Sequence, residues 1–462
     1  MSTRLTRRNA LRHALFGAGG IGLGALATGL PVSFLLDRRA AEAQADALPT
    51  YTILSTSGSG HPINANTPGT YARNPGDGSD PISLIEHARV SELGSAPLGT
   101  IGGEPYGAAD FETPVNLRLG ASSYKAAGVW GALDASLRQR MAFFHHATYA
   151  NAHPEFGNVM KFHGGIKARV GSGGEMLASF LAQETAVPLH TLTDKPVNVG
   201  GTLTTIDGRP LSTLNPPELR SLFAATTHPT GVPDPSEIVR LRDSLLDEIY
   251  ADVRVNGSYA QRAFLDRYAI SRSQAAELGA SLGPLLTDVS GNTSRDQVIA
   301  AVALLKLNVT PVVILSFRAG GDSHRDSDLG LEVTETIERL DAIQFLWTRL
   351  QMEGLADRVT FANLDVFGRK LIRNASGGRD HNGSHHAMMM FGPRIQPGVV
   401  GGLAPTMRGG RVIDFAATAI GDIPFDETLQ SAGKTLATAI GIPDDRIEAR
   451  MVGGQVVRDI LV

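Results

Sequence analysis

The segment from residue 377 to 386, GGRDHNGSHH, concentrates side chains that could do chemistry. It places three of the chain's thirteen histidines within six positions, and Asp380 stands directly before the first of them, His381. A carboxylate and an imidazole this close together can share a divalent cation, which acidifies a bound water or stabilises developing negative charge. A polar loop between glycines would explain the same residues without any chemistry. This segment alone leaves both interpretations open.

Four other segments are apolar and rich in β-branched or aromatic residues, which is typical of buried strands. They span residues 48–56, 141–149, 311–318 and 358–367. Helices are predicted between them, most clearly over 331–353, and also at 174–186, 234–250, 258–283 and 294–307. Strands that alternate with helices predict an α/β protein with a largely parallel sheet. Residues 208–290 lack strand signals and are expected to form a helical insertion.

Side chains able to bind metal or move protons lie near the ends of these predicted strands or in the loops that follow them. They are His61, His153, Asp322, His324, Asp365, Arg369, Asp380 and His381. Ligand groups of open α/β sheets gather beyond the carboxyl ends of the strands, so we expect these residues to meet at one edge. Asp326 and Asp328 are expected instead to start the helix at 331, because acids favour helix N-termini.

Several neighbouring residues are assigned structural roles. His145 and His146 are adjacent on a predicted strand, so their side chains point to opposite faces and one of them is expected to be structural. Met388–Met390 are expected in the core. His385 is a possible further contact of the site, and His386 is its structural neighbour.

The first 45 residues have the composition of a bacterial export signal. Arg7 and Arg8 precede an apolar, glycine-rich run, and the small-residue stretch AAEAQADA follows, with cleavage expected near Ala43 or Ala45. Paired arginines resemble the twin-arginine signal, which the export machinery for folded proteins reads. An uncleaved membrane anchor is the alternative. With cleavage, residues 46–462 are expected to be periplasmic or secreted, with no later stretch apolar enough to span a bilayer.

Charge and cysteine content exclude several kinds of function. Loss of residues 1–45 would remove six arginines, Asp37 and Glu42, and would change the formal charge from −4 to about −8. Nucleic acid and anionic lipid are therefore not expected as main partners. The chain has no cysteine, which excludes thiolate metal sites, thiol catalysis and disulfides and suits an oxidising compartment. Any metal must bind His, Asp, Glu or Asn, which suits zinc, manganese or calcium.

The order of these motifs resembles a bacterial family that is often exported by the twin-arginine route and is filed as a domain of unknown function. The motifs are Asp322-Ser323-His324, the helix at 331–353, the run 365–369 (DVFGR), Gly378-Arg379-Asp380-His381 and the turn at 399–402. The fold of this family is similar to that of the alkaline phosphatase and sulfatase superfamily. The resemblance implies a three-layer α/β sandwich and metal-dependent hydrolysis of phosphate or sulfate esters.

The resemblance also implies roles for particular residues. It assigns Asp322, His324, Asp380 and His381 to metal, and Arg369 to an anionic group, which it can hold through two hydrogen bonds. The set differs from the family at three positions. His61 stands where relatives have an aspartate, Val366 stands where they have a metal-binding glutamate, with Asp365 one position earlier, and Ala152-His153 replaces Ser-His. Thr148 is the nearest hydroxyl to that last position.

These differences lead to two hypotheses. In the first, the chain is an exported metallohydrolase that acts on a small anionic ester or a cell-envelope substrate, with metal-bound water as the attacking group and His153 and Arg369 as catalytic residues. In the second, it is a degenerate relative that keeps the fold and the His/Asp pocket and binds a ligand or partner without turnover. Metal stoichiometry and activity on aryl phosphate and sulfate esters separate the two.

Overall fold

A computed structural model describes most of the chain between residues 49 and 462. The described residues are 49–60, 65–70, 85–169, 174–191, 193–201, 205–206, 209–211, 213–223, 244, 248, 251, 284–317 and 322–462. The chain divides into two units, one of Met1–Ala43 with Leu214–Asn292 and one of Gln44–Thr213 with Thr293–Val462. The predicted export signal, most of the predicted insertion at 208–290 and His61 lie outside the described residues.

The second unit is built on a seven-stranded sheet in the order β15-β6-β14-β11-β1-β10-β7. Its strands are β1 (Tyr51–Ser57), β6 (Met141–His146), β7 (Val197–Asn198), β10 (Val312–Leu315), β11 (Val359–Asp365), β14 (His386–Phe391) and β15 (Gly398–Val400). Neighbouring strands are parallel except at β14, which is antiparallel to both β6 and β11. The predicted mixed α/β fold with a mainly parallel sheet is confirmed.

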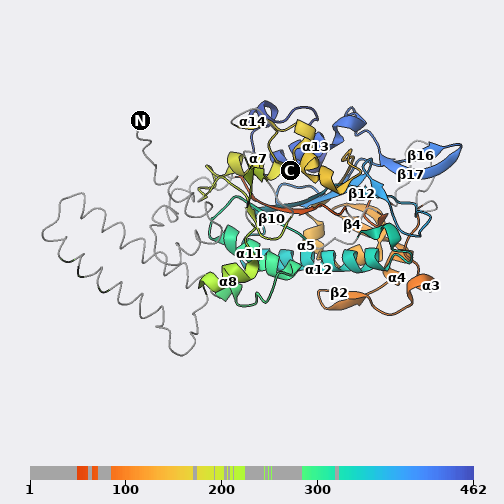
Figure 1. Ribbon diagram of the computed structural model, residues 1–462, viewed down its shortest axis with the longest axis horizontal. Helices are drawn as coiled ribbons and strands as arrows, with labels where there is room; N and C mark the ends of the chain where they lie inside the picture. Colours follow the sequence, from red (N-terminus) through yellow and green to blue (C-terminus); the bar gives the residue numbers. More distant parts are fainter. Residues whose placement is uncertain are drawn as a thin grey trace. The chain divides into compact units, whose positions relative to one another are not determined.

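Helices cover both faces of this sheet (Figure 1). On one face lie α7 (Leu177–Thr185), α13 (Thr428–Ala439) and α14 (Asp444–Arg450), and on the other α11 (Ser294–Lys306) and α12 (Gly330–Met352). Alternate residues of each strand point to opposite faces. Leu54 and Phe144 therefore join the core with α7 and α13. On the other face Phe361 stacks on Phe391, with ring centroids 4.8 Å apart.

Shorter elements complete the described chain. They are α3 (Val90–Leu93), β2 (Gly99–Ile101), β3 (Glu104–Tyr106), α4 (Ala109–Glu112), β4 (Pro114–Leu119), β5 (Ser122–Ala127), α5 (Ala135–Arg138), α6 (Phe156–Met160), β8 (Thr205–Ile206), β9 (Arg209–Pro210), α8 (Pro216–Phe223), β12 (Gly368–Arg369), β13 (His381–Asn382), β16 (Leu403–Arg408) and β17 (Arg411–Ala417). The expectation that residues 208–290 lack strands missed β9, because a two-residue strand leaves no periodicity to read.

The four predicted strands and the main predicted helix are confirmed, with ends that differ by a few residues. The start of α12 also has the predicted cause, because Asp326 accepts hydrogen bonds from the backbone N–H groups of Leu331 and Glu332, both at 3.0 Å. Asp328 accepts one from Gly330. Met388–Met390 are buried, as expected.

A buried ion pair fixes the segment that opened the sequence analysis. Arg379 is fully buried, and its guanidinium pairs with Glu332 of α12. It also donates to the carbonyls of Leu371, at 2.7 Å, and Glu86. Burial raises the pKa of Glu332 even though Arg379 opposes the shift, so loss of the arginine would leave a carboxyl group buried without its partner. This pair therefore holds the backbone just before Asp380 and His381.

We expect Arg379→Met to lower the free energy of unfolding by about 3–5 kcal/mol, because breaking a buried pair strands the remaining charge. The matched control is Arg295→Met. Arg295 forms a two-point ion pair with Asp341 at 2.9 Å but is 52% exposed, so its loss should cost no more than about 1 kcal/mol. Urea unfolding measures both. Equal losses in the two variants would contradict the anchoring role of Arg379.

Candidate metal centre

The candidate site lies at one edge of the sheet because four strands run in the same direction. β10, β1 and β11 are mutually parallel, and β6 and β11 are both antiparallel to β14, so β6 is parallel to β11 as well. The chain therefore leaves all four strands at the same edge, where loops of open α/β sheets carry their ligand groups.

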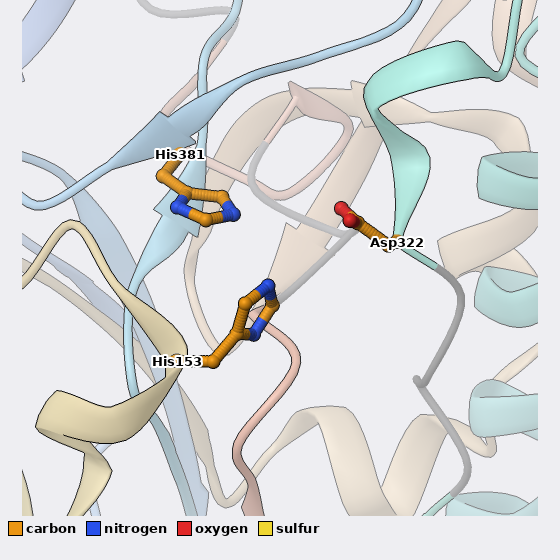
Figure 2. A group of neighbouring side chains, drawn as sticks. All are labelled: His153, Asp322 and His381. Atoms are coloured by element: carbon orange, nitrogen blue, oxygen red, sulfur yellow. The ribbon is translucent and has the colours of Figure 1, made fainter.

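His153, Asp322 and His381 converge at this edge (Figure 2). Each offers one possible ligand atom, and these atoms lie within 4.8 Å of one another. His153 follows β6, Asp322 follows β10, and His381 belongs to β13, which follows β11. Residues from three strand-end loops thus form a group of two imidazoles and one carboxylate, the kind of donor set that zinc and related divalent ions accept.

Backbone carbonyls orient both imidazoles of this group. His153 Nδ1 lies 2.7 Å from the carbonyl oxygen of Gly58, and His381 Nδ1 lies 2.5 Å from that of Asn151. A carbonyl can only accept, so each Nδ1 carries the proton and each neutral ring keeps its lone pair on Nε2. Metal-binding histidines are nearly always held by this kind of hydrogen bond.

His324 brings a third imidazole to the same place. Its Nδ1 lies 2.9 Å from Asp380 Oδ1, which also accepts a hydrogen bond from Asn374 Nδ2 at 2.8 Å. Its Nε2 lies 2.9 Å from His381 Nε2 and 3.4 Å from Asp322 Oδ1. If both rings were neutral and protonated on Nδ1, two lone pairs would face each other across 2.9 Å. Such a contact requires a positive charge between the rings, either a shared proton or a cation.

The protonation states of the site suit a cation. Burial opposes ionisation of Asp322, but the charge of Arg369 and then that of His324 outweigh it, and the pKa of Asp322 is lowered. The hydrogen bond from Asn374 is the main cause that lowers the pKa of Asp380. Burial lowers the pKa of His381, and the nearby charge of Arg369 adds to this effect. Two ionised carboxylates and a neutral His381 are the forms that bind metal.

Arg369 lies beside the site, but its guanidinium is already engaged. The side chain is 2% exposed, with Nη1 3.1 Å from Asp322 Oδ1 and Nη2 donating to the carbonyl of Ser59 at 2.7 Å. It therefore positions Asp322 and the loop after β1, rather than reaching into solvent for an anion. Lys370 is a partly exposed cation beside the site, 37% exposed and with its Nζ 3.9 Å from Asp380 Oδ2.

Asp365 does not lie with this group, although the sequence placed it among the candidate ligands. Its Oδ2 is 3.3 Å from His386 Nε2 and 3.8 Å from Arg339 Nη1, in a fully buried cluster. The reason is that Asp365 is still part of β11, so its side chain points into the protein beside the facing strand β14 rather than out of the loop that follows.

The other histidines predicted near the site pair with one another inside the protein. His385 Nε2 lies 2.9 Å from His145 Nδ1, and His386 Nδ1 lies 3.1 Å from His146 Nε2. All four rings are fully buried. Both His145 and His146 are thus structural, where one was expected. His385 contacts His145 instead of the candidate ligands. Thr148 is also fully buried, which removes it as an accessible nucleophile.

Asn374 and Lys370, which lie beside the site together with Asn151, were missed by the sequence analysis. Asn151 accepts from His381 through its carbonyl and from the N–H of Gly383 through its side chain, the latter at 2.9 Å. Asn374 joins Asp380 to the carbonyl of His324. Lys370 adds the accessible charge. Sequence spacing carries no signal for such contacts, because they depend on how loops fold.

Comparison with known proteins identifies one family model that matches residues 258–430, described as a protein of unknown function (DUF1501). The match includes Asp322, His324, Asp380 and His381 and leaves out His153. The expected similarity to a family of unknown function is thus confirmed for this part of the chain. No curated protein matches the chain.

We expect the folded protein to bind about one zinc ion per chain, and His381→Ala to weaken binding by more than about 100-fold, since it removes a direct ligand. Asn374→Ala removes only the hydrogen bonds that support Asp380 and His324, so it should weaken zinc binding by about 10- to 100-fold. His190→Asn is the control, because His190 is exposed in the turn between α7 and the start of β7, at the other end of the strands. Isothermal titration and elemental mass spectrometry measure these values. Equal affinity in all variants would contradict the site.

Proposed function

We propose that the protein is a metal-dependent hydrolase of phosphate or sulfate esters. The observation that carries this proposal is the convergence of His153, Asp322 and His381 at the strand-end edge, where their possible ligand atoms lie within 4.8 Å of one another. A divalent cation supplies charge stabilisation and an acidified water when bound, which is the chemistry that ester hydrolysis needs.

The donor set favours zinc among the candidate metals. His153, His381 and Asp322 would hold the ion, and calcium and magnesium prefer oxygen donors to imidazole. Three protein donors leave a coordination position for water or substrate, as in catalytic zinc sites. Manganese remains a second candidate, because it also accepts carboxylate and imidazole ligands.

The roles of the remaining residues follow from their exposure. Lys370 is placed to bind the charged oxygens of an anionic ester, because its ammonium group is accessible beside Asp380. Arg369 holds Asp322 in position. Because Thr148 is buried, the attacking group proposed here is water rather than a side-chain hydroxyl.

We also propose that the chain is exported and acts in the periplasm or outside the cell. Arg7 and Arg8 before the apolar run support a twin-arginine signal, and the absence of cysteine suits that compartment. No helix of the described residues is long and apolar enough to cross a membrane. The order of the Asp322, Arg369 and His381 motifs supports a relationship to the alkaline phosphatase and sulfatase superfamily.

The second candidate function is binding without turnover. Val366 favours it, because this residue stands where relatives have a metal-binding glutamate and is fully buried. In that case the site holds a cation and an anionic ligand, and no ester is cleaved.

With zinc or manganese bound, we expect turnover of aryl phosphate or sulfate esters, and Lys370→Met should lower kcat/KM by about 10- to 100-fold, the equivalent of one charge-assisted hydrogen bond. Lys125→Met, at an exposed position of β5, is the charge-matched control and should leave kcat/KM unchanged. Stoichiometric metal with no turnover of either ester class would instead support binding without catalysis. Turnover that survives chelation would contradict both.

A further inference from the structure

The β16–β17 hairpin ends in an exposed tip that projects from its unit (Figure 1). Gly409 and Gly410 form the turn with φ values of 58° and 77°, a conformation that suits glycine in a two-residue hairpin. No atom lies within 4 Å of a Cβ built at either position. The tip is thus open on all sides.

The tip carries two opposed positive charges. Arg408 and Arg411 are direct cross-strand partners, and both are exposed. Neither forms an ion pair with another residue in the described part of the chain. The hairpin's acidic residue, Asp414, is buried at its base. Like charges directly opposite each other destabilise an antiparallel pair, so folding does not explain this arrangement.

Two large apolar side chains flank these arginines. Met407 is 58% exposed and Ile413 is 45% exposed. The ladder pairs Thr406 with Asp414 and Met407 with Val412, so Ile413 is the extra residue of a bulge. Bulges are features that re-aim a side chain. Charged side chains can protect a two-stranded ribbon from unwanted pairing, but that role does not account for exposed Met407 and Ile413.

The base of the hairpin is built differently from its tip. Phe415 is buried, and its carbonyl accepts a hydrogen bond from Asn382 Nδ2 at 2.9 Å. The N–H of Leu371 donates to Asp414 at 2.9 Å. The base is therefore fixed to the loops of the candidate site, and Val412 packs against the same cluster as Phe415, while Met407 and Ile413 stay exposed.

We propose that this tip docks onto an anionic lipid surface. The arginines would pair with lipid phosphates, and Met407 and Ile413 would enter the boundary between headgroups and acyl chains. A soluble polyanion would use the charges alone, and a second copy of the chain would bring like-charged tips together. A lipid surface is the partner that fits both features.

The net negative charge of the chain does not prevent this contact. The formal charge is −4, but exposed charges farther away than about 8–10 Å are largely screened at physiological ionic strength. Arg408 and Arg411 lie directly opposite each other, so their two charges act together at the tip. The net charge of the chain led us not to expect anionic lipid as a main partner. The positively charged tip would be a local exception to that expectation. This inference is independent of any enzymatic activity.

The absence of cysteine allows a local test in the full chain. Met407→Cys, labelled with an environment-sensitive nitrobenzoxadiazole dye, should brighten and shift to the blue with phosphatidylglycerol vesicles and stay unchanged with phosphatidylcholine vesicles. Arg408→Gln with Arg411→Gln in the same labelled chain should weaken the apparent partition coefficient by about 30-fold. Val187→Cys, at a position 61% exposed in the turn after α7, is the control for label position and should not respond.

The local dye separates the tip from any other membrane-binding segment. Vesicle binding without a response at position 407 would overturn the proposal, because another part of the chain would then make the contact. An equal response to soluble polyphosphate would assign a soluble polyanion instead. A change in dye fluorescence that grows with protein concentration in the absence of lipid would instead indicate self-association through the tip. Near-ultraviolet circular dichroism establishes that each variant is folded.

Discussion

The candidate site depends on one buried charge pair, Arg379 with Glu332. A buried guanidinium is tolerated only when its donors are matched, and Arg379 meets that need with α12 and with the carbonyls of Leu371 and Glu86. Asp380 and His381 follow it directly in the chain. Glu332 lies in the first turn of α12, so the pair also fixes the start of this helix. Asp326, in the loop that carries Asp322, accepts hydrogen bonds from the same turn. One ion pair thus ties together both halves of the metal centre.

Periodicity predicted the architecture, because buried strands and an amphipathic helix leave a signal in the order of residues. Parallel strands then imply that loop residues meet at one edge, which is how Asp322, His324 and His381 could be anticipated together. The burial of Arg369 and Arg379 could not be predicted from the sequence. Arginine is almost never fully buried unless it is paired, and the partners here come from distant segments. Asp365 was misplaced because it lies within β11 itself, where its side chain points into the protein rather than into the loop that follows.

The segment GGRDHNGSHH contains two structures rather than one. His381, in its first half, faces the candidate cation site. In its second half, His386 begins β14 and His385 directly precedes that strand, and the two rings pair with His146 and His145 of β6. Burial keeps His145 and His385 neutral, since it lowers the pKa of His145 to about 4 and lowers that of His385 well below its ordinary value. Neighbouring histidines of one motif therefore differ in function because the strand begins between them.

The orientation of the metal centre is set by the fold. The acceptors that hold His153, His381 and His324 are Gly58, Asn151 and Asp380, from three separate loops. The three rings are therefore held in position by the folded chain itself. A site with three protein donors at a loop edge would leave a coordination position open for water if an ion were bound there.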